Sequence, residues 1–406
     1  MSSKHRLAPS PELRRHWQLV RALLIALIAT IGVGSWWLIA AATPSKPPAK
    51  SAGGLASHVP PVTSAPPVQT SSSGGFVALT ASGPGWLAPG SDPSVLPGPL
   101  LIADAGGNRV LIIDSSGRTM WQFPRPGDLS AGQTFKAPDD AWFTPNGRQI
   151  IATGEDDNVI YEIDVATHKI TYTYGTSGVP GSGDVNQLNG PDGVLMLPSD
   201  DLLAPDAGNC RVIMIPPGSH MISRQLGQTG TCVHNPPQSF SSPSGLFPMS
   251  NGDFLVTEGN GHWVSEMSLS GKLAWSVQVP GVSFIYETSE VGPDRYATVD
   301  HTLPGQALTF DHTGRVLWRY APTGSQALNK PSLVSALPNG DFIVSDKGNN
   351  RIIVVDPRTN AVVWQYGHSQ VAGSTPGFLN QPTGMDLYPP NSMMVKAAAT
   401  MGTVPR

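Results

Sequence analysis

A strand, a Gly/Asn turn and a second strand follow one another in the stretch Ser345-Asp346-Lys347-Gly348-Asn349-Asn350-Arg351-Ile352-Ile353-Val354-Val355-Asp356. It lies within residues 333–366, where further turns are expected at Pro338-Asn339-Gly340 and at Pro357-Arg358-Thr359-Asn360. Short apolar runs bounded by Gly, Pro and Asn are typical of β-strands joined by tight turns. The segment therefore predicts a small antiparallel sheet of four strands.

The same unit recurs along most of the chain from Gly98 onward. It opens with an apolar residue three places before a proline, and the prolines are Pro138, Pro191, Pro243, Pro331 and Pro382. They are separated by 53, 52, 88 and 51 residues. The spacing of 88 spans two shorter units, the second of which lies near Tyr286-Glu287-Thr288 and lacks the proline. Four short strands repeated at this period predict the blades of a β-propeller.

The first and last units are incomplete in complementary ways. Residues 99–123 hold strands two to four of a unit but no opening strand, whereas Pro382-Thr383-Gly384-Met385-Asp386-Leu387-Tyr388 is an opening strand with nothing after it. We therefore expect an all-β, six-bladed β-propeller at residues 98–389 in which the C-terminal strand completes the first blade. Such a ring leaves no unpaired strand between the first and last blades.

The composition excludes a global basic field of the kind that holds nucleic acid. The 406 residues carry a formal net charge of -4, and only 13% of them are charged. Nucleic-acid-binding domains carry clustered positive charge, so no nucleic-acid partner is expected. The 44 glycines and 40 prolines suit many tight turns better than a helical fold.

The N-terminal region has the pattern of a membrane anchor. Residues 1–21 are basic, and residues 22–42 contain no charge, which is about the 20 residues that a membrane-spanning helix requires. The basic residues place the N-terminus in the cytoplasm and the rest of the chain on the extracytoplasmic side of the cell membrane. We expect a single-pass transmembrane helix acting as a signal anchor. The alternative is a cleaved signal peptide, with Ala40-Ala41-Ala42 at the cut site.

Three further segments lie outside the repeats. Residues 43–75 are rich in Pro, Ser and Ala and are expected to form a disordered linker, because they cannot bury enough apolar surface to fold. Residues 76–97 have no firm assignment, and residues 390–406 are expected to be a flexible tail. The sequence contains no Asn-x-Ser/Thr glycosylation site, which fits a bacterial surface protein.

The repeats resemble those of the NHL-repeat family of six-bladed β-propellers. The opening Pro-x-Gly is similar to that family's opening in the units that begin at Pro191, Pro243 and Pro382. The pattern of Asp, Gly-Asn and Arg-Val or Arg-Ile is similar to its core motif at residues 104–110, 206–212 and 346–352. The fifth unit departs from it at Asp300-His301-Thr302-Leu303-Pro304-Gly305. Trp-bearing fourth strands also resemble those of pyrroloquinoline-quinone-type and arylsulfotransferase-type propellers.

Acidic residues recur where the second strand of a unit ends, at Asp104, Asp206, Glu258, Asp300 and Asp346, and Glu155 lies close by in the second unit. These six are the candidate channel-mouth residues. If the blades are equivalent, all six lie at one end of the propeller. A ring of carboxylates there would bind Ca²⁺ or attract a cationic ligand. The alternative is a structural role, because an Asp before a Gly/Asn turn bonds the turn or pairs with the Arg of the next strand.

Two histidines fall in the turns of adjacent units at the same end. His262 and His301, together with Glu258 and Asp300, are the candidate catalytic residues, since His and carboxylate side chains bind Zn²⁺ or perform acid-base chemistry. Related six-bladed folds include lyases, lactonases and sulfotransferases, but no intact motif of these is present. The alternative is that both histidines are ordinary turn residues.

The chain contains two cysteines, Cys210 and Cys232, in the part expected outside the membrane. An oxidising compartment permits a disulfide bond, which would restrain the loop between them. Two free thiols or a metal-binding pair are the alternatives.

Taken together, these features favour a membrane-anchored, extracytoplasmic binding module that presents its loops to a protein, peptide or glycan partner. The rival interpretation is an enzyme, either a lyase, hydrolase or transferase, with its site at the mouth of the central channel. A quinone-dependent dehydrogenase is a third possibility. The architecture alone does not choose among them.

Overall fold

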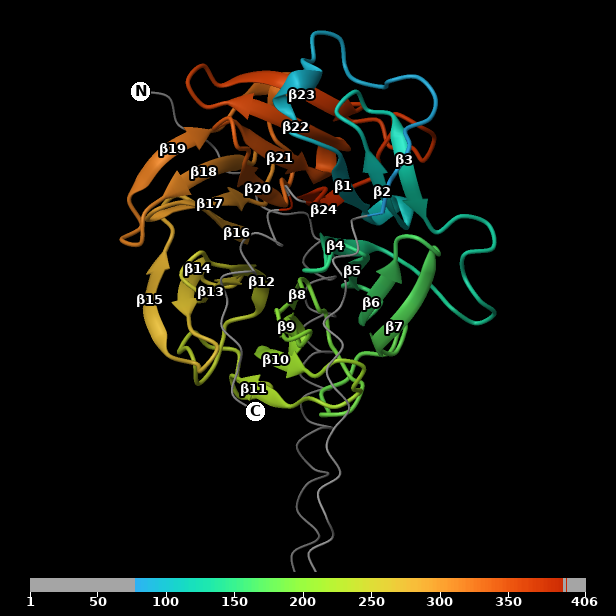
Figure 1. Cartoon of the computed structure of the whole chain (residues 1–406). Helices are drawn as coiled ribbons and strands as arrows, with labels where there is room; N and C mark the ends of the chain where they lie inside the picture. Colours follow the sequence, from blue (N-terminus) through green and yellow to red (C-terminus); the bar gives the residue numbers. More distant parts are fainter. Residues whose placement is uncertain (1–76, 390–391, 393–406) are drawn as a thin grey trace, which may run out of the picture. The chain divides into compact units, whose positions relative to one another are not determined.

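The computed structural model describes residues 77–389 and residue 392, and this part of the chain forms six four-stranded antiparallel sheets arranged as a ring (Figure 1). Among these residues no helix is long and apolar enough to cross a membrane. The expected anchor at 22–42 and linker at 43–75 lie outside the described residues, as does nearly all of the expected tail. The fold class predicted from the repeats is confirmed for the propeller.

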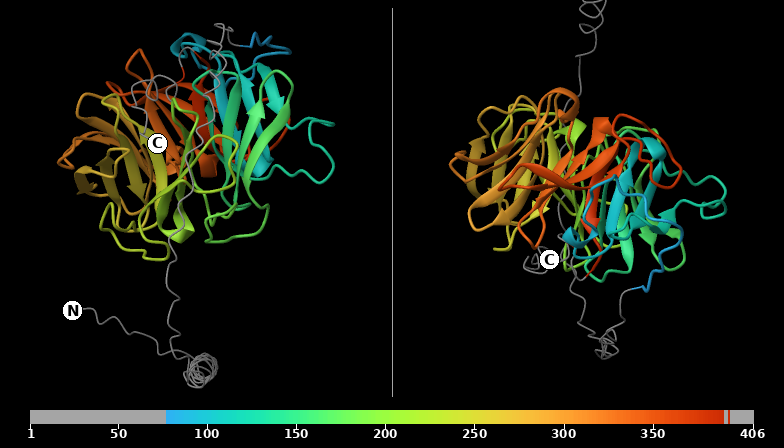
Figure 2. Two further views of the ribbon diagram at one scale, coloured as in Figure 1. Left: turned by 60° about the horizontal axis from the view of Figure 1, so that its bottom comes forward. Right: turned by 90° about the horizontal axis from the view of Figure 1, so that it is seen from above.

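Each blade consists of four strands that lie side by side, in order from the centre of the ring outward (Figure 2). Blade 1 contains β24 (Pro382–Leu387), β1 (Leu100–Asp104), β2 (Arg109–Ile113) and β3 (Thr119–Phe123); blade 2 contains β4 (Pro138–Phe143), β5 (Gln149–Gly154), β6 (Val159–Asp164) and β7 (Lys169–Gly175); blade 3 contains β8 (Leu195–Met196), β9 (Leu202–Asp206), β10 (Arg211–Ile215) and β11 (Arg224–Leu226). Blade 4 contains β12 (Pro243–Pro248), β13 (Phe254–Glu258), β14 (Trp263–Met267) and β15 (Leu273–Gln278); blade 5 contains β16 (Ile285–Gly292), β17 (Arg295–Asp300), β18 (Gln306–Phe310) and β19 (Val316–Tyr320); blade 6 contains β20 (Leu333–Ala336), β21 (Phe342–Asp346), β22 (Arg351–Asp356) and β23 (Ala361–Gly367). Short 3-10 helices are η1 (Pro93–Val95), η2 (Ala105–Gly107), η3 (Ala207–Asn209), η4 (Gly324–Gln326) and η5 (Lys347–Asn349).

The ring is closed by the last strand of the propeller. β24 pairs antiparallel with β1, and Leu387 lies opposite Leu100 while Met385 lies opposite Ile102. The C-terminal strand thus supplies the inner strand of blade 1, as its missing opening strand predicts. Because this pairing joins residues from the two ends of the propeller, it ties the first and last blades together.

The segment that had no assignment from the sequence reinforces this closure. Residues 77–97 cross from blade 1 to blade 6, with β-bridges from Ser82 to Thr119 and from Leu87 to Tyr366. The backbone N–H of Trp86 donates to the carbonyl of Ser116, and that of Asp92 donates to the carbonyl of Val363. The segment therefore holds together the two blades at which the ring closes.

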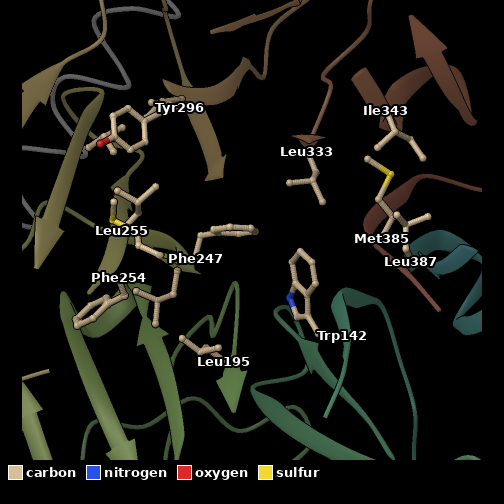
Figure 3. Packing of buried hydrophobic residues seen from close by; sticks show 14 of the residues in the cluster. Trp142, Leu195, Phe247, Phe254, Leu255, Tyr296, Leu333, Ile343, Met385 and Leu387 are labelled. Carbon is tan, nitrogen blue, oxygen red and sulfur yellow. The ribbon is translucent and has the colours of Figure 1, made fainter. Parts of the chain in front are cut away.

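The core consists of apolar side chains between the blades and at the inner strands. Strands such as β1 and β2 are buried on both faces, because each blade is packed between two others. Trp142 of blade 2 and Phe247 of blade 4 approach each other near the centre, with ring centroids 6.3 Å apart (Figure 3). Blades 2 and 4 are not neighbours, so this contact fills the middle of the ring with apolar groups.

The Pro-x-Gly opening has a steric explanation. A Cβ atom at Gly384 would lie 2.5 Å from Oδ1 of Asp140, and one at Gly245 would lie 3.2 Å from Cγ of Glu287. Inner strands of neighbouring blades come close together here, and a glycine permits that approach.

Candidate functional site

Three of the recurrent acids pair with an arginine of their own blade. Asp104, Asp206 and Asp346 are fully buried and accept a hydrogen bond from Nε of Arg109, Arg211 and Arg351 at 2.7, 2.8 and 2.8 Å. Each also accepts a backbone N–H from the loop before an opening proline, donated by Asn380, Asn189 and Asn329. This is the structural role that was the alternative to ligand binding.

The carboxylates of Glu258 and Asp300 also accept hydrogen bonds from residues close to their own blades. Glu258 accepts hydrogen bonds from the backbone N–H of Ser241 and, at 2.8 Å, from Nδ1 of His234. Asp300 accepts from the backbone N–H of Phe284 at 2.9 Å and from Nε2 of Gln306 at 3.1 Å.

His262 stands in a left-handed backbone conformation with φ of 60°, and its Nδ1 is buried without a partner among the described residues. The four candidate catalytic residues therefore do not form one group: the carboxylates of Glu258 and Asp300 bind other residues, and His301 lies elsewhere, against Tyr286.

Blade 4 lacks the repeated arginine. Trp263 stands at its position in the sequence, and His234, from the loop before the blade, makes the corresponding hydrogen bonds. The His234 ring is stacked on Trp263, which occupies the arginine position, with ring centroids 3.9 Å apart, and its Nε2 lies 3.1 Å from Oγ of Ser276. Ser276 has the same register in its blade as Gln365, which binds Arg351 in blade 6. The Glu258, His234 and Ser276 chain thus reproduces the Asp, Arg and Gln chain of other blades.

The predicted disulfide bond is present between Cys210 and Cys232, whose Cα atoms are 5.1 Å apart. It joins the turn of blade 3 to the loop that carries His234. Covalent attachment at Cys232 and the hydrogen bonds of His234 together fix this loop against blades 3 and 4.

The residue after each recurrent acid lies just beyond the end of the second strand, where its surroundings differ from those of the acid. In the six blades this position holds Ala105, Glu155, Ala207, Gly259, His301 and Lys347. Glu155 follows Gly154, which stands where the other blades have the acid. Three blades thus carry a chemically active side chain one residue beyond the repeated position.

A second departure from the repeat occurs directly after the opening proline. In three blades the position holds a hydroxyl side chain that donates to a backbone carbonyl of the next blade: Ser244 to Tyr286, Ser332 to Thr383, and Thr383 to Pro138. In blades 2 and 3 it holds Asp139 and Asp192 instead. Carboxylates cannot make these donations when ionised, so these two residues do not serve the scaffold in the same way.

These departures converge at the centre of one end of the propeller. Asp139, Glu155 and Asp192 each offer a carboxylate oxygen, and the three oxygens lie within 4.8 Å of one another. The hydroxyl of Tyr286 in blade 5 donates to Asp139 in blade 2 at 3.0 Å, and Nζ of Lys347 in blade 6 lies 3.3 Å from the same carboxylate. Blades 2 and 5 stand on opposite sides of the ring (Figure 1), so these contacts span its axis. We name this group the axial cluster; it comprises Asp139, Asp140, Glu155, Asp192, Tyr286, Glu287, His301 and Lys347.

The axial cluster holds more carboxylates than cations. Burial, followed by the repulsion of Asp139, raises the pKa of Glu155 to about 7. Burial and nearby carboxylates also raise the pKa values of Asp192 and Glu287 well above their usual range. Burial lowers the pKa of Lys347, but Asp139, Glu155 and Asp192 outweigh that effect and the net direction is upward. One ammonium group therefore faces several crowded carboxyl groups.

His301 is neutral at physiological pH. Burial, together with the charge of Lys347, lowers its pKa to about 4. Its Nδ1 lies 3.1 Å from the carbonyl oxygen of Pro331, so Nδ1 carries the proton and Nε2 is left with its lone pair. The ring is stacked on Tyr286 with centroids 4.6 Å apart, which fixes its orientation.

The apolar centre adjoins the cluster through Asp140. The indole N–H of Trp142 donates to Oδ2 of Asp140, and the Trp142 ring contacts Phe247. Asp139, Asp140 and Asp192 are buried, whereas Glu155, His301 and Lys347 are partly exposed. Solvent thus reaches the cluster on the side of these three residues.

Of the axial cluster, the sequence patterns singled out Glu155 and His301. The sequence patterns did not identify the other six residues, because the candidates were chosen among residues that recur from blade to blade. The six are Asp139, Asp140, Asp192, Tyr286, Glu287 and Lys347. Aligning the units would have shown acids after Pro138 and Pro191 where the other proline openings have Ser or Thr.

Comparisons with known proteins agree with this architecture. Residues 222–385 match the model of the outer membrane protein assembly factor BamB family, a match that covers less than half of the chain. No curated protein is similar enough in sequence to count as a match. The expected likeness to pyrroloquinoline-quinone-type propellers is thus supported, and the narrower NHL-repeat resemblance stays a prediction.

The solved structures that this chain resembles are distant in sequence. A protein of unknown function from Bacteroides caccae is 14% identical over 71% of this chain and 98% of its own, with a TM-score of 0.49. Virginiamycin B lyase from Staphylococcus aureus is 17% identical over 71% of this chain and 87% of its own, with a TM-score of 0.46. A nidogen/laminin complex provides a third, 14% identical over 71% and 97%, also with a TM-score of 0.46. Identities this low say nothing about the ligand or reaction of this chain.

Proposed function

We propose that this protein is an extracytoplasmic binding module, held at the cell membrane by residues 22–42, whose axial cluster binds a cationic group of its ligand. The observation that carries the proposal is the convergence of Asp139, Glu155 and Asp192 within 4.8 Å at the centre of the ring. Opposite charge is the complement that such a site would recognise.

The balance of charge supports this choice of ligand. Lys347 is the cation in direct contact with Asp139, and it also lies over the Tyr286 ring with Nζ 5.6 Å from the ring centroid. A ligand that brings another positive charge would relieve the repulsion among the remaining carboxylates. The position of the Lys347 ammonium group, beside the Asp139 carboxylate and over the Tyr286 ring, is an example of how these residues accommodate an amine.

The binding experiment uses purified full-length protein in detergent and chelator, with thermal unfolding measured against spermidine, arginine amide and uncharged analogues. We expect the cationic probes to raise the melting temperature and Asp192→Asn to lose most of that response. Asp184→Asn is the matched control, because the Asp184 side chain is 79% exposed. The proposal fails if no cationic probe binds, or if the Asp192 variant responds like the wild type.

An enzyme is the second candidate, favoured by one feature of the same cluster. A pKa of about 7 suits Glu155 to act as a general base, and Nε2 of the neutral His301 can accept a hydrogen bond from a ligand. Any ligand found in the binding experiment should therefore be incubated with wild type and with Glu155→Gln and examined by mass spectrometry. Conversion by the wild type alone would support an enzyme, and an unchanged ligand would leave a binding module.

A further inference from the structure

We propose that Asp139, Glu155 and Asp192 form a binding site for one hard divalent cation of the size of Ca²⁺ or Mn²⁺, in which Lys347 is the displaceable counter-ion. The inference rests on the proposed function, because both require the axial cluster to bind positive charge, but here a metal ion takes the place of a ligand amine between the three carboxylates. It concerns the bound ion alone and assigns it no reaction.

The separation of the oxygens permits them to share one ion. Ca²⁺ binds oxygen at about 2.3–2.6 Å, so two ligands on opposite sides of it are about 4.6–5.2 Å apart. Three oxygens that all lie within 4.8 Å of one another can therefore share such an ion. Mg²⁺ also fits within this bound, but it gives up its water reluctantly and is usually bound by one or two carboxylates, so a site of three protein carboxylates suits Ca²⁺ better.

The chemistry of the ligands selects a hard ion. All three groups are carboxylates, which suit Ca²⁺ and Mn²⁺ better than they suit Zn²⁺ or copper. His301 belongs to the axial cluster, yet no histidine or cysteine among the described residues joins the three-oxygen group. This differs from the His and carboxylate site that the sequence suggested for Zn²⁺.

A second observation points to a ligand independently of the acidic character. Asp192 is only 3% exposed, and its Oδ1 has no hydrogen-bond partner among the described residues. A buried carboxylate oxygen without a partner is unfavourable, and native structures nearly always satisfy such atoms. Because this carboxylate belongs to the three-oxygen group, a shared cation would satisfy it.

Lys347 is suited to give way to an incoming ion. Its Nζ lies 3.3 Å from the carboxylate of Asp139, and the side chain is 19% exposed. The flexible side chain can therefore move its ammonium group toward solvent. The ammonium group contributes one positive charge, whereas a divalent ion contributes two. Replacing Lys347 with a neutral side chain should therefore strengthen ion binding.

The test is calorimetric titration of purified full-length protein, freed of metal by chelation, with Ca²⁺, Mn²⁺ and Mg²⁺. We expect one ion per chain, with Ca²⁺ or Mn²⁺ bound more tightly than Mg²⁺. Asp192→Asn and Glu155→Gln should each weaken binding about tenfold or more, because each removes a charged ligand. Lys347→Met should tighten binding, and Asp184→Asn should leave it unchanged.

The gain expected for Lys347→Met is a result that misfolding would not produce, and circular dichroism checks the fold of every variant. The metal inference is overturned if no divalent ion binds the wild type. It is also overturned if Asp192→Asn, Glu155→Gln and Lys347→Met all bind the ion as tightly as the wild type does. The amine probes separate the two proposals. Binding of spermidine through Asp192 without metal binding would leave the proposed function standing, and loss of both would remove both.

Discussion

The crowded carboxylates of the axial cluster should make the stability of the metal-free protein depend on pH in an unusual direction. The perturbation is Glu155→Gln, which removes one titrating group and keeps its shape. Burial and the charge of Asp139 raise the pKa of Glu155 from 4.5 to about 7 in the folded chain. The folded state therefore binds a proton more tightly than the unfolded state does.

The sign follows from proton linkage. Because the folded pKa is the higher one, the stabilising contribution is complete below about pH 4.5 and is lost as the pH rises through about 7. One pKa unit corresponds to about 1.4 kcal/mol, so the shift amounts to about 3 kcal/mol in total and about 2–3 kcal/mol between pH 5 and pH 8. Wild type should lose this much stability relative to Glu155→Gln over that interval.

The assay is urea unfolding in chelator, followed by the fluorescence of the ten tryptophans, at pH 5, 6, 7 and 8. The difference between wild type and Glu155→Gln removes the titration of groups that Glu155 does not influence. It retains the titration of Glu155 together with that of Asp192 and Lys347, whose pKa values Glu155 raises. Asp184→Asn provides the control for removal of a carboxylate outside the axial cluster; the side chain of Asp184 is 79% exposed and lies 3.7 Å from Arg211. A flat or rising difference for Glu155→Gln would refute the reasoning. Addition of a bound divalent ion should remove the loss of stability at pH 8.

Three further predictions concern the scaffold. Arg211→Met should cost about 3–5 kcal/mol in the free energy of unfolding because it leaves the carboxylate of Asp206 buried and uncompensated, and adding Asp206→Asn should recover part of that loss in a double-mutant cycle. Reducing the bond between Cys210 and Cys232 should cost about 3 kcal/mol, measured by urea unfolding with and without dithiothreitol; equal midpoints would contradict this. Truncation before Pro382 should unfold or aggregate the propeller, because blade 1 would lose its inner strand β24, and a soluble monomer with native circular dichroism would oppose that view.

Much of the fold could be predicted because each blade is a local unit whose pattern survives in the sequence. The turn at Gly348 and Asn349, the alternating apolar residues around it and the spacing of the opening prolines are all read within one repeat. Ring closure also followed, since an opening strand at Pro382 had no partner except the incomplete first unit. The disulfide bond was predictable for a simpler reason, because only two cysteines exist.

The residues of the axial cluster could not be predicted from the repeats in the same way. Recurrence drew attention to Asp104, Asp206 and Asp346, yet recurrence marks what every blade needs for its own turn, and these acids pair with arginines of the same blade. The residues that gather at the centre are departures from the repeat, such as Asp139 and Asp192. Asp346 ends β21 and Lys347 begins η5, so these neighbours in sequence have different surroundings.

The sequence by itself determined the number of blades, their boundaries and the strand that closes the ring, because turns and strand periodicity depend on residues close together in the chain. Only the tertiary structure decided that Asp139, Asp192, Tyr286 and Lys347 meet, since they come from blades 2, 3, 5 and 6 and lie far apart in sequence. The ring brings the inner strands of these blades together around one axis. There, burial and mutual repulsion raise the pKa values of carboxyl groups such as Glu155 and Asp192.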